Sequence, residues 1–321
     1  MKISDEYSGR VPLVVVGAVE LDTVITPFAQ KWNVLGGSSS YASLAASFFG
    51  PVGMVGVVGM DFPRACIETY RRAGIETSGL KTEKGKTFRW SGEYQLNMNS
   101  PRTISSELNV FAGFKPELPE SYRKSPFLFL ANMSPTMQLD VLSQARHPRF
   151  IVADTMDLWI KTDRTKLNKV ISQVDMLMVR DVEARMLSGH QSVIKAARDI
   201  LRMGPDYVVV RKGEHGAMLF SRFGMFIIPA YPVEDVEDPT GAGDSFAGGF
   251  LGSLAKAEIV DYRTVCEAMV CGSVMASFGV EAFGVNRLAS LSKSEINQRI
   301  SHFRTIMTGC EKRAQKKLAV V

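Results

Sequence analysis

Short runs of wholly apolar residues recur along the chain and alternate with segments of helical spacing. Leu13–Val16 is the first such run and ends at Gly17, as a buried strand of a parallel sheet would. The later runs are Phe127–Ala131, Phe150–Ala153, Met176–Val179 and Val208–Val210. The helical segments between them are Thr136–Arg146, Thr162–Gln173 and Gln191–Met203. This alternation predicts an α/β fold whose sheet is mostly parallel.

Two stretches, Val19–Leu35 and Thr87–Phe111, interrupt this rhythm with alternating polar and apolar residues. The period of two is that of half-buried strands, and it is clearest at Phe88, Trp90, Gly92 and Tyr94. The two stretches flank the helical segments Ser38–Phe49 and Asp61–Ala73. We expect residues 19–36 and 86–111 to pair into a small lid sheet, inserted into a body formed by residues 1–18, 37–85 and 112–321. The alternative is that these strands extend an edge of the main sheet.

The stretch Asp238–Ser245 combines a rigid entry at Pro239 with the small residues Gly241, Ala242 and Gly243. Helical spacing follows over Asp244–Lys256, Asp261–Phe278 and Lys293–Met307. A helix that begins at such small residues presents unpaired backbone N–H groups at its positive end, which suits phosphate. Asp244 lies at the rim of this anion site, and the helix end is expected to lower its pKa and keep it ionised as a base. The alternative is a tight turn that Asp244 only caps.

Composition and charge exclude several classes of protein. The chain has 321 residues, 45% of them hydrophobic and 22% charged, as in an ordinary globular protein. The net charge of +5 is modest, and the only basic cluster is Lys312–Lys317, so nucleic acid is not an expected partner. No apolar run reaches the length of a membrane span, and the polar N-terminal residues are unlike a signal peptide. Since Cys66, Cys266, Cys271 and Cys310 form no paired spacing, we expect buried thiols in a cytoplasmic protein.

Two well-known nucleotide-binding motifs do not fit the glycine-containing segments of the chain. Gly85-Lys86-Thr87 ends like a phosphate-binding P-loop, but Leu80 stands where that motif requires glycine. The Gly241 segment is not a dinucleotide fingerprint, because Phe246 occupies the place of the third glycine. The four histidines are scattered and form no metal or hydrolase motif.

The segment from Asp238 to Gly249, Asp-Pro-Thr-Gly-Ala-Gly-Asp-Ser-Phe-Ala-Gly-Gly, resembles the C-terminal signature of the PfkB, or ribokinase-like, carbohydrate kinases. Further blocks fit the family in order and spacing: Gly17 and Asp22 after the first strand, Gly36-Gly37 before a helix of small residues, and Lys212–Gly216. The resemblance covers about residues 10 to 300. It implies a doubly wound, mostly parallel sheet with a β lid.

The resemblance also implies the reaction, the ATP-dependent phosphorylation of a hydroxyl on a sugar or related small molecule. By this likeness Asp244 takes the proton of the attacking hydroxyl, and the amides of Gly241, Ala242 and Gly243 stabilise the transferred phosphoryl group. Asp22, Gly36 and Gly37 are expected to hold the substrate. The nucleotide residues implied are Lys212, Gly213, Gly216 and, in the adenine pocket, Glu281. Asp238 and Thr240 occupy positions that bind a monovalent cation such as K⁺ in some members.

Two departures from the family pattern concern the metal and the substrate. The family's Asn-x-x-Glu block, which organises Mg²⁺ and phosphate, reads Arg180-Asp181-Val182-Glu183 here. Glu183 is retained, Arg180 could contact phosphate, and Asp181 could replace the missing asparagine at a metal-bound water. In the helix after Gly37, Tyr41 removes one sugar contact and offers an aromatic face.

Three functions therefore stay open. The leading hypothesis is a sugar kinase that uses ATP and Mg²⁺, with Asp22, Tyr41, Asn97, Asn99 and Arg102 converging on the substrate. The second is a nucleoside kinase of the adenosine type, in which Tyr41 and the lid aromatics stack on a base. The third is a catalytically weak homologue that binds nucleotide or sugar as a regulator. Exposed edges of a small lid sheet also predict a homodimer through the lid.

Overall fold

The computed structural model describes residues 11–309 and contains two β-sheets. Cys310, the basic cluster Lys312–Lys317 and the N-terminal residues of the sequence lie outside the described residues. The large sheet has nine strands in the order β13-β12-β11-β10-β9-β8-β1-β4-β5. Its chain order reverses on either side of β1, so that β4 and β8 flank β1 as parallel neighbours. This arrangement is that of a doubly wound sheet.

Seven strands of the large sheet are parallel, and β12 and β13 continue it as an antiparallel hairpin. The central strands are wholly buried, as expected for a sheet that is covered on both faces. The bounds are β1 Leu13–Val16, β4 Val52–Gly59, β5 Ile75–Glu83, β8 Phe127–Leu130, β9 Phe150–Asp154, β10 Met176–Arg180, β11 Tyr207–Arg211, β12 Ala217–Ser221 and β13 Gly224–Ile228.

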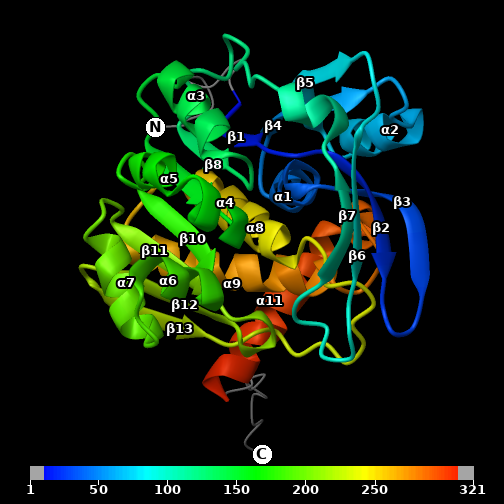
Figure 1. Cartoon of the computed structure of the whole chain (residues 1–321). Helices are drawn as coiled ribbons and strands as arrows, with labels where there is room; N and C mark the ends of the chain where they lie inside the picture. The colour runs from blue at the N-terminus through cyan, green and yellow to red at the C-terminus, as the bar shows by residue number, and fades with distance from the viewer. Residues whose placement is uncertain (1–10, 310–321) are drawn as a thin grey trace, which may run out of the picture.

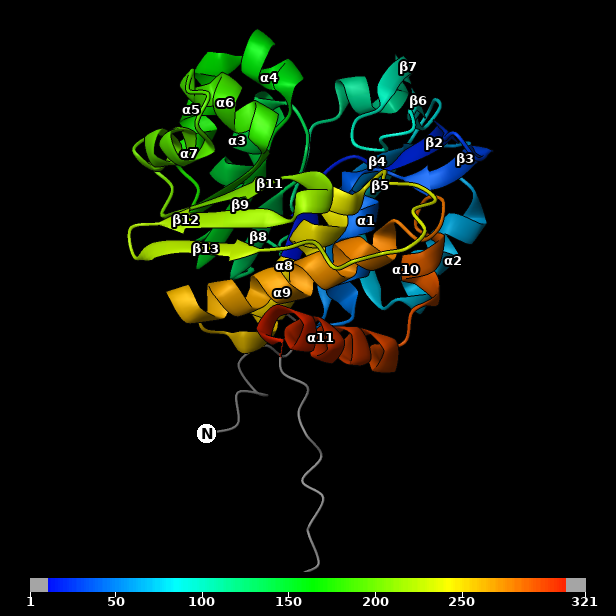
Figure 2. The same cartoon turned by 90° about the horizontal axis from the view of Figure 1, so that it is seen from below.

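Helices cover both faces of the large sheet, as Figure 2 shows. Helices α3 Pro135–Gln144, α4 Asp157–Thr162, α5 Arg164–Ile171, α6 Asp181–Ser188 and α7 Val193–Leu201 lie on one face. Helices α1 Ser38–Ser47, α8 Ala242–Ala257, α9 Tyr262–Gly279 and α11 Lys293–Thr308 lie on the opposite face. The remaining helices are α2 Arg64–Arg72 and α10 Asn286–Ser290. No helix formed by residues 11–309 has the length and apolar character that a membrane span requires.

The second sheet has four strands in the order β3-β2-β6-β7 and lies beside the body (Figure 1). Its strands are β2 Glu20–Ile25, β3 Gln30–Gly36, β6 Phe88–Glu93 and β7 Arg102–Glu107. All four lie within the two segments whose period of two predicts a separate sheet, so the alternative of an edge extension is wrong. Asp61 fixes the base of this lid sheet, because its carboxylate accepts from the Thr87 amide at 2.7 Å and pairs with Arg89 at 2.9 Å.

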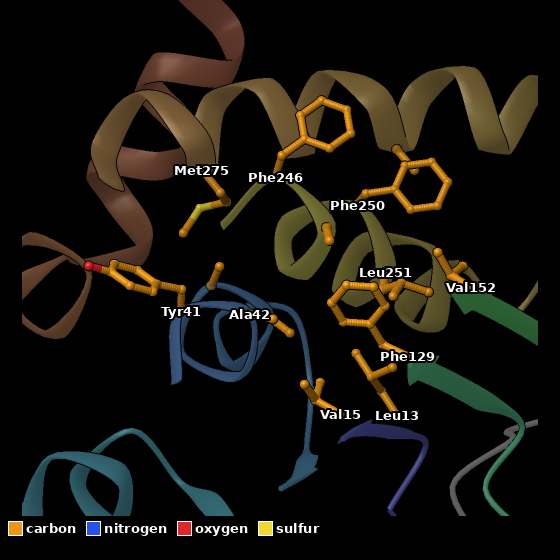
Figure 3. Close-up of a cluster of buried hydrophobic side chains, with 14 of the residues drawn as sticks. Leu13, Val15, Tyr41, Ala42, Phe129, Val152, Phe246, Phe250, Leu251 and Met275 are labelled. Atoms are coloured by element: carbon orange, nitrogen blue, oxygen red, sulfur yellow. The ribbon is translucent and has the colours of Figure 1, made fainter. Parts of the chain in front are cut away.

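Helix α8 is packed so closely that its N-terminus has little freedom of position. A side chain at Gly248 would meet the Ala42 carbonyl oxygen of α1 at 2.2 Å, and one at Gly249 would meet Met275 of α9 at 2.6 Å. Below this contact, Phe250 and Leu251 of α8 join Leu13 and Phe129 of the sheet in the main hydrophobic core (Figure 3). The core therefore holds the helix that follows the Asp238–Ser245 stretch against both α1 and the sheet.

The predicted strands and the predicted helices are all present, with shifts of a few residues at their ends. The segment predicted as one helix over Thr162–Gln173 is preceded by the separate short helix α4. Strands β4, β5, β12 and β13 were not predicted. Among the described cysteines, Cys66, Cys266 and Cys271 are free thiols, and only Cys271 is fully buried.

Candidate active site

Charged side chains stand at the carboxyl ends of three neighbouring parallel strands. Asp154 ends β9, Arg180 ends β10 and Arg211 ends β11. The ladder register places Met178 beside Asp154 and Arg180 beside Arg211. Carboxyl ends of strands in an open α/β sheet form the edge at which such folds bind ligands. This edge and the N-terminus of α8 together make the candidate site.

The first turn of α8 is the place where the sequence predicts an anion site. Gly241 has the left-handed φ of 72°, and a side chain there would lie 2.3 Å from the ring of Tyr41. The Ala242 amide already donates to the Pro239 carbonyl oxygen at 3.2 Å. Within residues 11–309 no partner accepts from the backbone N–H groups of Gly241 and Gly243. The available amides are therefore those of the two glycines, and Ala242 contributes less than the sequence predicts.

The Asp244 carboxyl group lies in this first turn and is partly buried. Burial, together with the nearby Asp154 charge, raises the pKa of Asp244 to about 7, although Arg211 acts in the opposite direction. The prediction that the helix end keeps this pKa low is therefore wrong, because desolvation outweighs the helix dipole. A carboxyl group whose pKa is close to neutral is well matched to general-base work.

Asp22 belongs to lid strand β2 and is buried at the base of the lid. Its Oδ2 atom lies where a side chain at residue 36 would be, only 1.9 Å from that position, which explains the glycine at 36. Its Oδ1 atom is buried without a hydrogen-bond partner among the described residues. An unpaired buried carboxylate oxygen is costly unless a ligand satisfies it. Asp22 therefore has the free acceptor that a substrate hydroxyl would need.

Glu20 lies beside Asp22 on the same strand, and their carboxyl groups are hydrogen-bonded. Burial raises the pKa of Glu20 to about 7, and burial together with the Glu20 charge raises the pKa of Asp22. The Asp244 charge also raises the pKa of Glu20, which places the proposed base and this carboxyl pair in one site. The lid base and the α8 N-terminus thus face one region.

Gly37 and Tyr41 form the wall between these two groups. Gly37 has a φ of 91°, and a side chain there would lie 2.5 Å from the Ala18 carbonyl oxygen. The Tyr41 ring packs under Gly241, and its hydroxyl points away from the apolar cluster (Figure 3). That hydroxyl is buried without a hydrogen-bond partner among the described residues. Tyr41 is a core residue with one unsatisfied polar atom, and its aromatic face is covered by Gly241, not open for stacking.

Two further polar contacts connect the segment after lid strand β6 to the body. The Tyr94 hydroxyl lies 3.1 Å from the Thr240 hydroxyl, and the Asn99 amide donates to Glu214 at 3.3 Å. Asn97 lies in the exposed turn beside Asn99, and exposed Arg102 is paired with Glu93 at 2.6 Å. The structure therefore gives Asn97 and Arg102 no contact with Asp22 or Asp244, and their substrate role stays a prediction.

We expect Tyr94→Phe to raise the KM for the acceptor about three- to tenfold with little change in kcat. The substitution removes a hydrogen bond worth about 1 kcal/mol that holds the lid against the body. Steady-state kinetics at varied acceptor concentration would measure the effect. Tyr122→Phe is the matched control, because it removes a phenol hydrogen bond to Glu76 that joins two parts of the body. Equal KM changes in both variants would contradict a role of Tyr94 in lid closure.

The predicted nucleotide residues fall in two places. Lys212 follows β11, and Gly213 and Gly216 form the exposed turn between β11 and β12. Within the described chain no acceptor pairs with the Lys212 ammonium group, which keeps it available for phosphate. Glu281 instead pairs with Arg287 at 2.9 Å and with Arg299 at 2.6 Å. Its carboxylate is therefore paired with arginines of helices α10 and α11, so any contribution to an adenine pocket would come from its backbone.

The predicted metal residues are also engaged by protein groups. Glu183 accepts from the Arg180 backbone N–H and from Arg180 Nε, both at 2.7 Å, and Asp181 pairs with Arg185 at 2.5 Å. Asp238 accepts from the amides of Thr240 and Gly284 at 2.9 and 3.0 Å. Among residues 11–309, no three His, Cys, Asp or Glu side chains are placed to hold a metal ion. Asp181 and Glu183 are therefore paired with arginines, and their role at Mg²⁺ stays a prediction, as does the cation site at Asp238 and Thr240.

The sequence profile of the pfkB family carbohydrate kinases matches residues 13–291, which is most of the chain. The protein is a PfkB-family kinase. It is a phosphotransferase with an alcohol group as acceptor. A cytidine kinase of Thermococcus kodakarensis is 30% identical to it over 251 residues, which cover 76% of this chain and 88% of the relative.

Solved structures of ribokinase-like proteins share this kinase's fold. The nucleoside kinase of Methanocaldococcus jannaschii superposes with a TM-score of 0.74 at 20% identity, covering 92% of this chain and 100% of the other. A putative ribokinase II of E. coli, crystallised with ATP and Mg²⁺, gives a TM-score of 0.73 at 18% identity over 91% and 99% of the two chains. The likeness confirms the doubly wound sheet with a smaller second sheet.

Three residues of the candidate site were not predicted from the sequence: Glu20, Asp154 and Arg211. Asp154 and Arg211 could have been found by one signal, a charged residue directly after a buried apolar run, whereas Glu20 opens lid strand β2 and shows no such signal. Asp154 follows the apolar run Phe150–Ala153, and Arg211 follows Val208–Val210. Because such positions line the ligand-binding edge of a parallel sheet, a charge there is rarely placed only for solvation.

Proposed function

We propose that this kinase transfers the γ-phosphoryl group of ATP to a hydroxyl of a ribonucleoside or a related sugar, with Asp244 as the general base. The observation that supports this proposal is that two acidic side chains with different properties lie in one site. Asp244 lies in the first turn of α8 beside free glycine amides, and Asp22 offers a buried, unpaired carboxylate oxygen opposite. The first can accept the hydroxyl proton, and the second can fix the orientation of the acceptor.

In the proposed reaction the acceptor hydroxyl gives its proton to the Asp244 carboxylate and its oxygen forms a bond to the γ-phosphorus. The bond between that phosphorus and the β–γ bridging oxygen breaks, and ADP leaves with the bridging oxygen. The amides of Gly241 and Gly243 donate to the oxygens of the phosphoryl group in transit. ATP is expected to enter with Mg²⁺, and we assign no protein carboxylate as a direct ligand of that ion.

A ribonucleoside is the acceptor that we place first, because the 30% identical relative is a cytidine kinase. The structure gives no support to a stacking role of the lid aromatics. Tyr94 and Trp90 pack with Val24 and Phe283 in a small core of their own. Base recognition would then depend on polar groups near Glu20 and the lid tip at Asn99.

A panel of acceptors tests this proposal. ADP release would be followed with cytidine, adenosine, inosine, ribose, fructose and sugar phosphates at equal concentrations. Cytidine or another ribonucleoside is expected to give a kcat/KM at least about tenfold above that of free ribose, as contacts worth about 1.4 kcal/mol would. Turnover with hexoses alone would replace the nucleoside proposal with the sugar-kinase alternative. ATP binding without turnover on any acceptor would favour the regulatory homologue.

Activity is expected to fall as the pH drops below about 7. The pKa of Asp244 is raised to about 7, and only the ionised carboxylate accepts a proton. In the acidic limit kcat/KM should therefore fall about tenfold for each pH unit. Glu20 titrates in the same range, so Glu20→Gln serves as the reference profile. If the acidic limb disappears in Glu20→Gln, that limb belongs to Glu20 and not to Asp244.

The lid also supports the proposal of a homodimer. Strands β3 and β7 are the unpaired edges of the lid sheet. Three large apolar side chains on these strands and the β2–β3 turn are exposed: Phe28, Trp32 and Ile104. Covering this apolar surface with a second lid would remove it from water. A mass of about 71 kDa by light scattering, twice the 35.3 kDa of one chain, is the expected result.

A further inference from the structure

We propose that Arg211 is a catalytic residue that binds the phosphoryl group in transit and carries part of its developing charge. The inference rests on the proposed function, since it takes the N-terminus of α8 as the place of phosphoryl transfer. It goes beyond that function because the glycine amides and Asp244 do not require a side-chain cation. The Arg211 guanidinium is this cation.

The position of Arg211 is set by two neighbours. It is the last residue of β11, so its side chain starts from the ligand-binding edge of the sheet. Its guanidinium lies against the first turn of α8, where a side chain at Gly243 would be 2.5 Å from Nη1. Gly243 therefore does two things, because it exposes its own amide and leaves room for the guanidinium beside that amide. The guanidinium therefore lies beside the first turn of α8.

The hydrogen bonds of Arg211 leave part of the guanidinium unused. Nη2 donates to both oxygens of Asp154 at 2.8 Å, and this pair fixes the plane of the group. Nε is buried without a partner, and Nη1 has no acceptor among residues 11–309. Buried donors without partners cost free energy, and native proteins avoid them where no ligand is to be bound. A phosphate oxygen is the acceptor that a forked guanidinium fits.

The surrounding charges support a role in catalysis. Asp154, Glu183 and Asp244 lie around the Arg211 guanidinium and raise its pKa, so it stays charged at every working pH. Without a cation these three carboxylates would repel a triphosphate. The same guanidinium lowers the pKa of Asp244 against the effect of burial. Arg211 therefore can hold the phosphoryl group while keeping the neighbouring base ionised.

Arg180, on the adjacent strand, does not share these properties. Its Nε donates to Glu183, its side chain is 44% exposed against 13% for Arg211, and among residues 11–309 no hydrogen bond or ion pair joins it to α8. The competing explanation for Arg211 is that it only neutralises the buried Asp154. Removing both charges together separates the two explanations, since the Asp154 partner is then no longer left unpaired.

The test uses three variants. The first is a double variant that carries both Asp154→Asn and Arg211→Met, and the second is the single variant Arg211→Lys. Arg202→Met is the control. Arg202 lies at the surface after α7 and is paired with Asp199. Turnover would be measured with the best acceptor of the panel, and binding of ADP with and without aluminium fluoride by calorimetry. We expect the double variant to lose about 100- to 1,000-fold in kcat and to bind ADP within about threefold of the parent. Aluminium fluoride, which mimics the phosphoryl group, should no longer tighten ADP binding.

A double variant with kcat within about fivefold of the parent and unchanged aluminium fluoride binding would overturn the proposal, since Arg211 would then only balance Asp154. If the double variant does not fold, the single variant Arg211→Lys tests the proposal. A loss of at least tenfold supports a role for the guanidinium fork, and parental kcat and aluminium fluoride binding overturn it. The proposed function fails separately, if Asp244→Asn keeps full turnover while the parent enzyme is active.

Discussion

Replacing Asp244 by asparagine is expected to lower kcat by at least about a hundredfold, the scale of general-base effects. Asparagine has nearly the same shape, so the first turn of α8 and its glycine amides should be preserved. What is lost is the group that accepts the proton of the attacking hydroxyl. The pKa of this carboxyl group is raised to about 7, mainly by burial, which means that its charged form is unfavourable in the folded protein. Its removal is therefore not expected to impair folding.

Steady-state kinetics with the best acceptor of the panel would measure this loss, and calorimetry with ADP would show that the nucleotide site is intact. Asp199→Asn is the matched control, because Asp199 lies at the surface in ion pairs with His190 and Arg202. Parental turnover in Asp244→Asn would contradict the role of Asp244 as base. Loss of ADP binding together with turnover would instead point to damage to the first turn of α8.

The alternation of apolar runs and helical segments was sufficient to predict the fold class, but it did not predict four of the strands. Strand β4, Val52–Gly59, is buried along its whole length between β1 and β5. Glycines at 53, 56 and 59 interrupt its apolar run, and glycine is unfavourable in strands. The structure explains them by close approach, since a side chain at Gly53 would meet the Tyr122 ring at 2.6 Å. A tertiary contact therefore determined the residue, and no local pattern reveals it.

In the candidate site, the sequence predicted groups that act through the backbone or through a familiar spacing. Gly241, Gly243 and Asp244 stand together in the first turn of α8, and Asp22 lies at the lid base against Gly36. Effects that depend on distance between elements were not predictable. The pKa of Asp244 depends on burial and on Asp154, which lies 90 residues away in the sequence. Ion pairing similarly engaged Glu281 and Arg102 with partners that spacing alone does not reveal, whereas the Asp181–Arg185 pair has the i, i+4 spacing of a helix.

Four carboxyl groups from three parts of the chain meet between the lid and α8: Glu20, Asp22, Asp238 and Asp244. Burial raises the pKa of each, and a nearby charge adds to the effect: Asp244 for Glu20, Glu20 for Asp22, Glu237 for Asp238 and Asp154 for Asp244. Before a ligand binds, protons shared among them reduce this cost, as in the hydrogen-bonded pair of Glu20 and Asp22. A polyhydroxyl acceptor that donates hydrogen bonds to Asp22 would favour its ionised form. Acceptor binding is therefore expected to release protons.

Gly241→Ala is expected to remove most activity and to lower the free energy of unfolding by about 2–5 kcal/mol. The left-handed backbone, with φ of 72°, accounts for about 1–2 kcal/mol of this cost. Overpacking accounts for a further 1–3 kcal/mol or so, because the added methyl group would lie 2.3 Å from the buried Tyr41 ring. Relief of this contact requires the first turn of α8 to move, and a displacement of about 1 Å can cost about a hundredfold in kcat.

Gly74→Ala separates the two contributions, because Gly74 has nearly the same φ of 70° but no heavy atom within 4 Å of the added methyl group. Its backbone cost should match that of Gly241→Ala, while its kcat should stay at the parental value, since Gly74 follows α2 outside the site. Urea unfolding and steady-state kinetics on both variants give the comparison. Equal losses of stability in the two variants would mean that the Tyr41 ring moves aside without cost. Parental kcat in Gly241→Ala would mean that the position of these amides does not limit phosphoryl transfer.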